Sequence, residues 1–270
     1  MLIQKEFHDI PSPLDGGRPI RIFVISPVVP NYPQAKFPGV VVFSEIYQVT
    51  GPVERFAGSI ASQGYVVACP STYHEFVGPG AIEYDVEGTD RGNKYKTEKT
   101  VAAYDEDATL SVDLLMSLPN CNGRIAGTSV IHFRTGLNPA PQATGMCLGG
   151  HLAFRAAFDP RGGDDSLVRV RKGDLTGKGE LVMIFGKQDT HVPRAGRDLI
   201  RTSLEDANVP VSFLEVQAQH AFIRDEQSKG RWDAALTRSL FAFMMEVFER
   251  TVGRDLGPRL DLNKEPEHVC

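Results

Sequence analysis

Short apolar runs, rich in β-branched residues, alternate along the chain with longer segments in which apolar positions recur every three or four residues. The runs predict buried strands at Gly39–Phe43, Tyr65–Pro70, Leu181–Phe185 and Val211–Val216. The helical spacing predicts helices over Pro52–Gln63, Val101–Leu118, Leu148–Phe158, Arg197–Asn208 and Trp232–Phe248. This alternation predicts an α/β fold in which helices cover both faces of a mostly parallel, doubly wound sheet.

The two ends of the chain differ from this central pattern. Lys5–Ile10 and Ile20–Pro27 read as strands separated by a turn cluster, which predicts an antiparallel hairpin at a sheet edge. Residues 253–270 form a polar tail that we expect to be poorly ordered. We therefore expect a single α/β domain over residues 1–252, followed by the tail.

The sequence departs from the regular strand pattern just before the glycine-rich turn Gly145–Gly150. The segment Ser129–Ala143 contains Asn-Pro-Ala-Pro, which cannot continue a central strand. If this segment loops out, Ile125–Thr128 runs directly into Gly145. In the alternative, Ser129–Phe133 extends the strand and a loop precedes the turn.

A second irregularity follows that turn. A doubly wound sheet needs another buried strand soon after Pro160, but Arg161–Glu180 offers only the short apolar stretch Leu167–Val170 among glycines and charges. The sequence therefore predicts that one central strand is absent, which would leave ladder groups of the neighbouring strands unpaired.

Composition limits the classes of partner. The formal net charge is -5, with 41% hydrophobic and 23% charged residues, which argues against nucleic acid and against an anionic membrane surface. No apolar run of about 18 residues occurs, and the N-terminus lacks a signal-peptide core. Four scattered cysteines fit a reducing compartment. We therefore expect a cytoplasmic protein, either a monomer or a weak homodimer.

The turn Gly145-Met146-Cys147-Leu148-Gly149-Gly150 carries the candidate nucleophile. It places Cys147 between glycines, after a predicted strand and before a predicted helix, as in a nucleophile elbow with a thiol in place of the usual hydroxyl. The N-terminus of the following helix has a partial positive charge, so we expect it to favour the thiolate.

Two further groups follow later strands. Asp189 comes just after Leu181–Phe185, and His220 comes after Val211–Val216. The order nucleophile, acid, histidine is that of the α/β-hydrolase fold, in which histidine moves the proton and the carboxylate orients the histidine. The backbone N–H groups of Leu148 and Ile46 are the candidates for the oxyanion hole.

These motifs resemble the dienelactone hydrolase (carboxymethylenebutenolidase) family. The matching pieces span about residues 20–250: Ser44-Glu45-Ile46-Tyr47, Cys69-Pro70, the cysteine elbow with His151 to Phe154, Gly186–Asp189 with Val192-Pro193, and His220-Ala221-Phe222. The resemblance implies ring-opening hydrolysis of a carboxylate-bearing lactone, such as dienelactone to maleylacetate. It also implies that Glu45 pairs with the resting thiol and helps to form the thiolate when substrate binds.

The resemblance extends to residues that bind the substrate. Arg91 and Tyr95 match the family's Arg-x-x-x-Tyr, and Arg224 matches its arginine after the histidine, so both arginines are implied to bind the substrate carboxylate. From its residue type alone, Arg91 would be read as a solvated surface charge. If the segment around Arg91 and Tyr95 is helical, the two side chains share one face.

The remaining histidines and the cofactor question are quickly stated. We expect His151 to pack within its helix, His191 to lie off the line to Cys147, and His74 to be a candidate for lining the pocket. The sequence shows neither metal-ligand spacing nor a phosphate-binding glycine motif, so we expect no metal and no cofactor.

The leading hypothesis is thus a cysteine hydrolase acting on a small anionic lactone or ester. The alternatives are a broad carboxylesterase or thioesterase with the same triad, and a catalytically impaired binding protein of the same fold.

Overall fold

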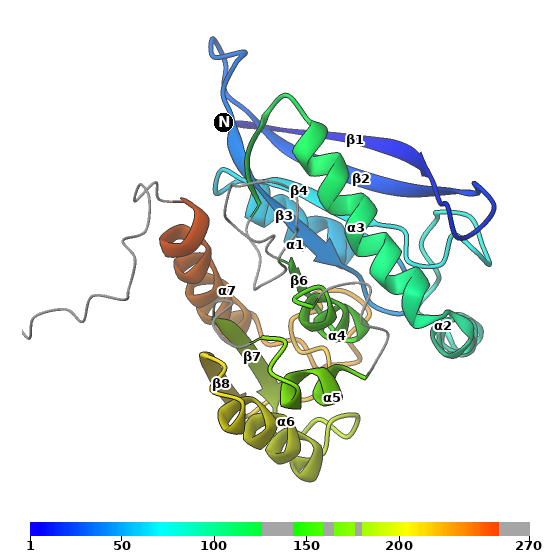
Figure 1. Cartoon of the computed structure of the whole chain (residues 1–270), viewed down its shortest axis with the longest axis vertical. Coiled ribbons are helices and arrows are strands. Elements are labelled where there is room, and N and C mark those ends of the chain that lie inside the picture. Colours follow the sequence, from blue (N-terminus) through cyan, green and yellow to red (C-terminus); the bar gives the residue numbers. More distant parts are fainter. Residues whose placement is uncertain (126–142, 159–164, 176–179, 254–270) are drawn as a thin grey trace, which may run out of the picture.

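The computed structural model describes residues 1–125, 143–158, 165–175 and 180–253 (Figure 1). Its larger sheet contains β1 (Leu2–Pro11), β2 (Pro19–Val28), β3 (Phe37–Phe43), β4 (Val66–Pro70), β5 (Cys121–Ile125) and β6 (Ala143–Gly145). Its smaller sheet contains β7 (Leu181–Gly186) and β8 (Val211–Val216). The helices are α1 (Gly51–Ala61), α2 (Val86–Glu98), α3 (Val101–Ser117), α4 (Leu148–Arg155), α5 (Ser166–Arg171), α6 (Arg194–Asp206) and α7 (Ala234–Phe248), which continues as the π-helical turn η2 (Glu249–Gly253).

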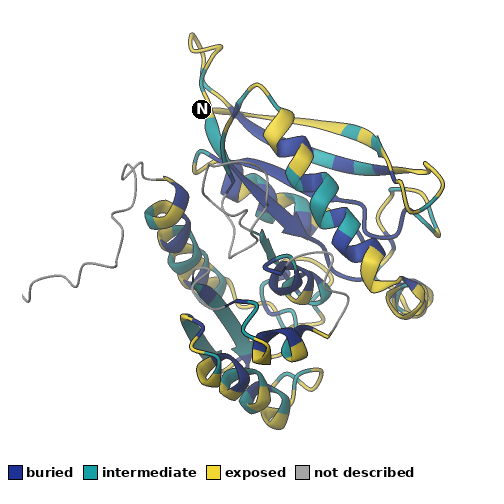
Figure 2. Cartoon of the chain, viewed as in Figure 1, coloured by how far each residue is buried: buried dark blue, intermediate teal, exposed yellow. Residues whose placement is uncertain are grey.

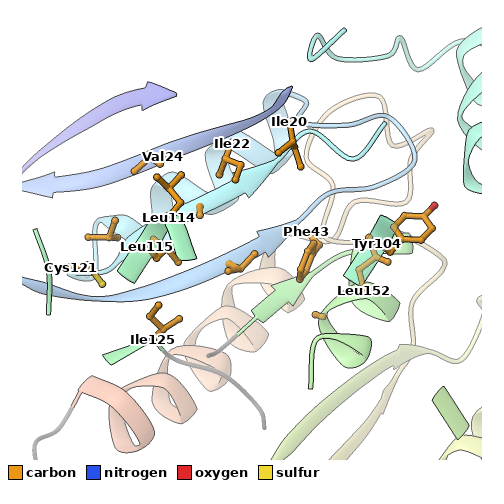
Figure 3. Packing of buried hydrophobic residues seen from close by; sticks show 14 residues of the cluster. Ile20, Ile22, Val24, Phe43, Tyr104, Leu114, Leu115, Cys121, Ile125 and Leu152 are labelled. Atoms are coloured by element: carbon orange, nitrogen blue, oxygen red, sulfur yellow. The ribbon is translucent and has the colours of Figure 1, made fainter. Parts of the chain in front are cut away.

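The larger sheet is mixed, in the order β1-β2-β4-β3, with β5 and β6 both pairing with β3. The β1–β2 pair is the antiparallel edge hairpin predicted from the sequence, and β3 pairs with β4 in parallel. Alternation along the strands explains the two covered faces. Ile22, Val41 and Val66 pack with residues of α3 and α4, whereas Val40, Val42 and Val67 pack with residues of α1 and α7 (Figure 3 shows the α3 side).

Two short strands share one position beside β3. Phe37 and Gly39 of β3 are paired with Cys121 and Ile125 of β5, and further along β3 Val41 to Phe43 are paired with Ala143 to Gly145 of β6. β5 and β6 thus lie one after the other along the same edge of β3, and the segment between them, on which the two sequence alternatives differ, lies outside the described residues. The alternative strand at residues 129–133 falls outside the described residues.

β7 and β8 form a separate parallel pair, with Leu181 opposite Val211 and Gly186 opposite Val216. Within the described ranges no strand lies between β6 and β7, in agreement with the expected absence of a central strand. The stretch Leu167–Val170 belongs to α5 and is not a strand. The expectation that β7 is fully buried is wrong, because Val182 to Phe185 are only half-buried in a strand that has one described neighbour (Figure 2).

Helices α4 and α7 join the two sheets through side-chain packing. On α4, Leu152 and Ala153 pack in the core of the larger sheet, whereas Phe154 packs with Leu181 and Leu204 beside β7. On α7, Phe248 packs against the larger sheet, and Leu240 packs with Ala218 and Phe222 after β8. The two sheets are therefore held together by apolar contacts made on shared helices.

The long segment from Ser71 to Glu98 contains α2, capped by Asp85, whose carboxylate accepts a hydrogen bond from the Gly88 N–H at 2.6 Å. Cys69 is fully buried in β4 and belongs to the core. No described helix combines the length and apolar character needed to cross a membrane.

A buried ion pair holds α4 onto α3. Arg155 donates from Nε and Nη2 to the two carboxylate oxygens of Asp105, at 2.7 and 2.9 Å, and both side chains are buried. Removing one partner of such a pair takes away two charge-assisted hydrogen bonds and leaves the other buried charge less well compensated.

We therefore expect Asp105→Ala to lower the free energy of unfolding by about 3–5 kcal/mol. The measurement is urea denaturation followed by circular dichroism. Asp113→Ala is the matched control, because Asp113 is exposed on the same helix; its effect should stay within about 0.5 kcal/mol. Equal effects of the two substitutions would contradict a stabilising role for the buried pair.

Candidate active site

The elbow depends on a close backbone approach between α4 and β3. Cys147 joins β6 to α4 with φ 59° and ψ −121°, a strained conformation for a residue with a side chain. A Cβ atom on Gly149 would lie 2.2 Å from the Phe43 carbonyl oxygen, and one on Gly145 would lie 2.4 Å from the Gly149 carbonyl carbon. Only glycine fits at these two positions, which is why the elbow motif contains them.

Three groups from different parts of the chain meet at Cys147. His220 Nε2 lies 3.1 Å from Cys147 Sγ, and His220 Nδ1 lies 2.8 Å from Asp189 Oδ2. The other oxygen of Asp189 accepts a hydrogen bond from the His191 N–H at 2.7 Å. The structure thus brings together Cys147, Asp189 and His220, the residues predicted from the sequence to form a triad.

The charge state of the thiol differs from the sequence expectation. Burial, followed by the negative charge of Glu45, raises the pKa of the Cys147 thiol to about 11. The backbone N–H of Leu148, at the start of α4, acts in the expected direction and lowers that pKa, but burial outweighs it. Burial also lowers the pKa of His220, although Asp189 opposes this shift. At neutral pH the pair is therefore a neutral thiol beside a neutral imidazole.

Glu45 is buried next to the thiol but is paired with other groups. Its Oε2 accepts a hydrogen bond from the Tyr84 hydroxyl at 2.9 Å, and its Oε1 lies 3.4 Å from Arg224 Nη1. Burial raises the pKa of Glu45, and the Arg224 charge opposes that shift. The structure thus joins Glu45 and Arg224 to each other and leaves His220 as the group hydrogen-bonded to Cys147.

Arg224 is enclosed by aromatic rings. Its guanidinium carbon lies 4.4 Å from the centroid of the Tyr84 ring and 5.8 Å from that of Tyr47. Its Nη2 donates to the Gln227 carbonyl oxygen, and its Nε has no hydrogen-bond partner. Sequence reasoning missed Tyr84; its position in the long segment after β4, among other aromatic residues, was the available signal.

The residues expected on α2 lie at different depths. Arg91 is exposed, whereas Tyr95 is half-buried, with its ring stacked on Phe76 at 5.1 Å and tilted against Tyr73 at 5.5 Å. The helical condition for Arg91 and Tyr95 to share a face is met, since both belong to α2. Lys96, which the sequence did not single out, contributes a positive charge that lowers the pKa of Cys147.

The candidate oxyanion donors are the backbone N–H groups of Leu148 and Ile46. Leu148 begins α4, so its N–H has no partner within the helix, and Ile46 lies buried after β3.

The other histidines have different surroundings. His151 contacts the Ser166 hydroxyl at 3.2 Å. The His191 ring lies 4.3 Å from that of His220, between centroids. His74 is buried against Glu75 and Asp107.

A sequence model of the dienelactone hydrolase family matches residues 25–252. The chain belongs to the dienelactone hydrolase family. Its catalytic class follows from this membership and from its relatives: it is a carboxylic ester hydrolase with an α/β-hydrolase fold.

Known relatives of this dienelactone hydrolase family member are similar over most of their length. A Saccharomyces cerevisiae protein named "Putative carboxymethylenebutenolidase" is 49% identical over 291 aligned positions that cover all of both chains. A carboxymethylenebutenolidase of Pseudomonas sp. strain P51 is 28% identical over 227 residues, 79% of this chain and 84% of that protein. The crystal structure of a "Putative Dienelactone Hydrolase" from Klebsiella pneumoniae has a TM-score of 0.69 at 16% identity, covering 93% of this chain and 100% of that one.

The alignment with the yeast protein is longer than this chain: its 291 positions exceed the 270 residues by 21, so at least that many positions of the relative have no counterpart here.

We expect alkylation of Cys147 by iodoacetamide to rise about tenfold per pH unit between pH 7 and pH 9, because only the thiolate reacts and the pKa lies above this range. Glu45→Gln removes a negative charge that raises this pKa, so it should speed alkylation at pH 8 several-fold.

The measurement is mass spectrometry of the modified peptide against time. Glu83→Gln is the matched control, because Glu83 is exposed one residue before Tyr84, and it should leave the rate unchanged. A labelling rate independent of pH would indicate a resting thiolate–imidazolium pair and contradict the neutral pair.

Proposed function

We propose that the chain opens a small carboxylate-bearing lactone of the dienelactone type, with Cys147 as the nucleophile. The observation that carries this proposal is the relay from Cys147 Sγ to His220 at 3.1 Å and from His220 to Asp189 at 2.8 Å. These distances are within hydrogen-bond reach, as nucleophilic catalysis with a general base requires.

In the acylation step, His220 Nε2 takes the thiol proton while Cys147 Sγ attacks the lactone carbonyl carbon. The N–H groups of Leu148 and Ile46 are proposed to hold the resulting oxyanion. The intermediate collapses with cleavage of the ring C–O bond, and His220 returns the proton to the leaving oxygen. The product is a thioester on Cys147 that keeps the opened ring attached.

Deacylation uses the same groups with water as the nucleophile. His220 removes a proton from water as its oxygen attacks the thioester carbon, and the proton passes to the departing Cys147 sulfur. The products are the free carboxylic acid and the regenerated thiol. Throughout, Asp189 holds the His220 ring in one tautomer and stabilises the imidazolium that forms.

The preference for an anionic substrate rests on the paired Glu45 and Arg224. Arg224 is buried, and its Nε lacks a hydrogen-bond partner, so the side chain can donate to a substrate carboxylate that reaches it. Such a carboxylate would compete with Glu45 for Arg224. Without Arg224 as its partner, the Glu45 carboxylate would be a stronger base and would help to take the proton from the thiol. Arg91 on α2 is proposed as the second cation of the substrate site.

We expect Cys147→Ala to reduce kcat/KM for dienelactone by at least about 10³-fold, because the nucleophile is lost. Cys147→Ser should retain part of this activity. Cys69→Ala is the matched control, since it removes a thiol buried in β4, and it should remain active. The measurement is the decrease in lactone absorbance; equal rates for wild type and Cys147→Ala would rule out this nucleophile.

We expect Arg224→Met to raise KM for an anionic lactone by about 10–100-fold, the loss of one charge-assisted hydrogen bond. Arg91→Ala should act in the same direction with a smaller effect, because Arg91 is exposed. A neutral ester such as p-nitrophenyl acetate serves as the control substrate, for which KM should change little. Equal losses on both substrates would favour a broad carboxylesterase without a carboxylate site.

A further inference from the structure

A second cluster of charged side chains lies away from the triad, between the segment after β4 and helix α3. Lys99, at the end of α2, is buried, and its Nζ contacts Glu75 Oε1 and lies 2.8 Å from Asp107 Oδ2. The same ammonium donates to the Thr72 carbonyl oxygen at 2.7 Å. One cation thus engages one oxygen of each carboxylate.

The other oxygens of the two carboxylates face His74. Glu75 Oε2 and Asp107 Oδ1 each lie 3.7 Å from His74 Nδ1, and all three atoms are buried and without a hydrogen-bond partner. The three potential ligand atoms lie within 4.8 Å of one another, and His74 is only 5% exposed. A buried nitrogen and two buried oxygens therefore converge on one point, and the only other hydrogen-bonding contact that the described residues offer the His74 ring is with the Ser71 backbone, which leaves one ring nitrogen free to act as a ligand.

Hydrogen bonding does not explain this arrangement. A separation of 3.7 Å is too long for an N–H···O hydrogen bond, so a proton on His74 would bond to neither carboxylate. The two carboxylates also share one ammonium, and burial raises the pKa of Asp107, so its ionised form would need a further cation. Buried charge of this kind is stabilised by a cation or by metal coordination.

The spacing suits a metal ion. A point equidistant from three atoms with these separations lies about 2.0–2.4 Å from each, which overlaps zinc–nitrogen and zinc–carboxylate bond lengths of about 2.0–2.2 Å. One imidazole nitrogen and two carboxylate oxygens are a ligand set typical of zinc and its neighbours in the first transition series.

We propose that His74, Glu75 and Asp107 bind a divalent transition metal of the zinc class, with water in the fourth position. The metal would tie the segment that carries Tyr73 to α3, apart from the hydrolytic step. Sequence spacing concealed this site, because Asp107 lies 32 residues beyond Glu75 and only the fold brings the two together. It would correct the expectation that the chain holds no metal.

The test uses the Cys147→Ala protein, in which the triad thiol cannot capture metal. After dialysis against EDTA, the protein is titrated with ZnCl2 by calorimetry and with CoCl2 by visible absorption. We expect one equivalent of Zn²⁺ to bind at micromolar free metal and to raise the Tm. Co²⁺ should give d–d bands without thiolate charge transfer.

Adding His74→Gln should weaken Zn²⁺ binding at least tenfold and abolish the Tm rise. His151→Gln is the matched control, because it removes a histidine outside the cluster, and it should bind as before. Circular dichroism of the metal-free variants establishes that each is folded, and Glu75→Gln provides a second ligand variant should His74→Gln not fold. The absence of Zn²⁺ binding overturns the proposal. So does binding that survives His74→Gln, which would place the metal elsewhere, for example at His191 and His220.

Discussion

The contact on which the site depends is the close approach of the α4 backbone to the end of β3. Gly145 and Gly149 allow the Phe43 carbonyl to lie where a side chain would otherwise stand. That approach holds Cys147 in a strained turn, with its sulfur directed to His220 and the first N–H of α4 beside it. It also places Glu45, which follows β3, near the sulfur. One steric condition at two glycines therefore determines the positions of the Cys147 thiol, of the Leu148 N–H group and of the buried Glu45 carboxylate.

Burial then decides how these groups are charged. Near the elbow the helix N-terminus favours a thiolate, but the loss of solvent and the charge of Glu45 disfavour it more strongly. Glu45 in turn remains close to Arg224 and Tyr84, which compensate its own burial. In the resting site the charge of Glu45 is thus balanced by Arg224, and the Cys147 thiol is neutral. A substrate that changed the partners of Arg224 would change the electrostatic field at the sulfur.

Much of this could be predicted from the sequence, because the signals are local. Glycines around Cys147 define the elbow, and Asp189 and His220 follow their strands at once, so their meeting follows from the topology of a parallel sheet. What could not be predicted depends on contacts between distant segments: the half-buried state of β7, the pairing of Tyr84 with Glu45, and the raised pKa of Cys147. Likewise, α2 carries few apolar residues, so its periodicity gave no clear helical signal.

The division of the sheet has a mechanical consequence for the triad. Cys147 is attached to the larger sheet through β6, whereas Asp189 and His220 follow β7 and β8 of the smaller one. Within the described ranges no backbone ladder links these two sheets, and they are joined by the side chains of α4 and α7. Apolar contacts permit small sliding movements more readily than a hydrogen-bonded ladder does. The distance between His220 and Cys147 is therefore the one that a small shift of one sheet past the other would change most directly.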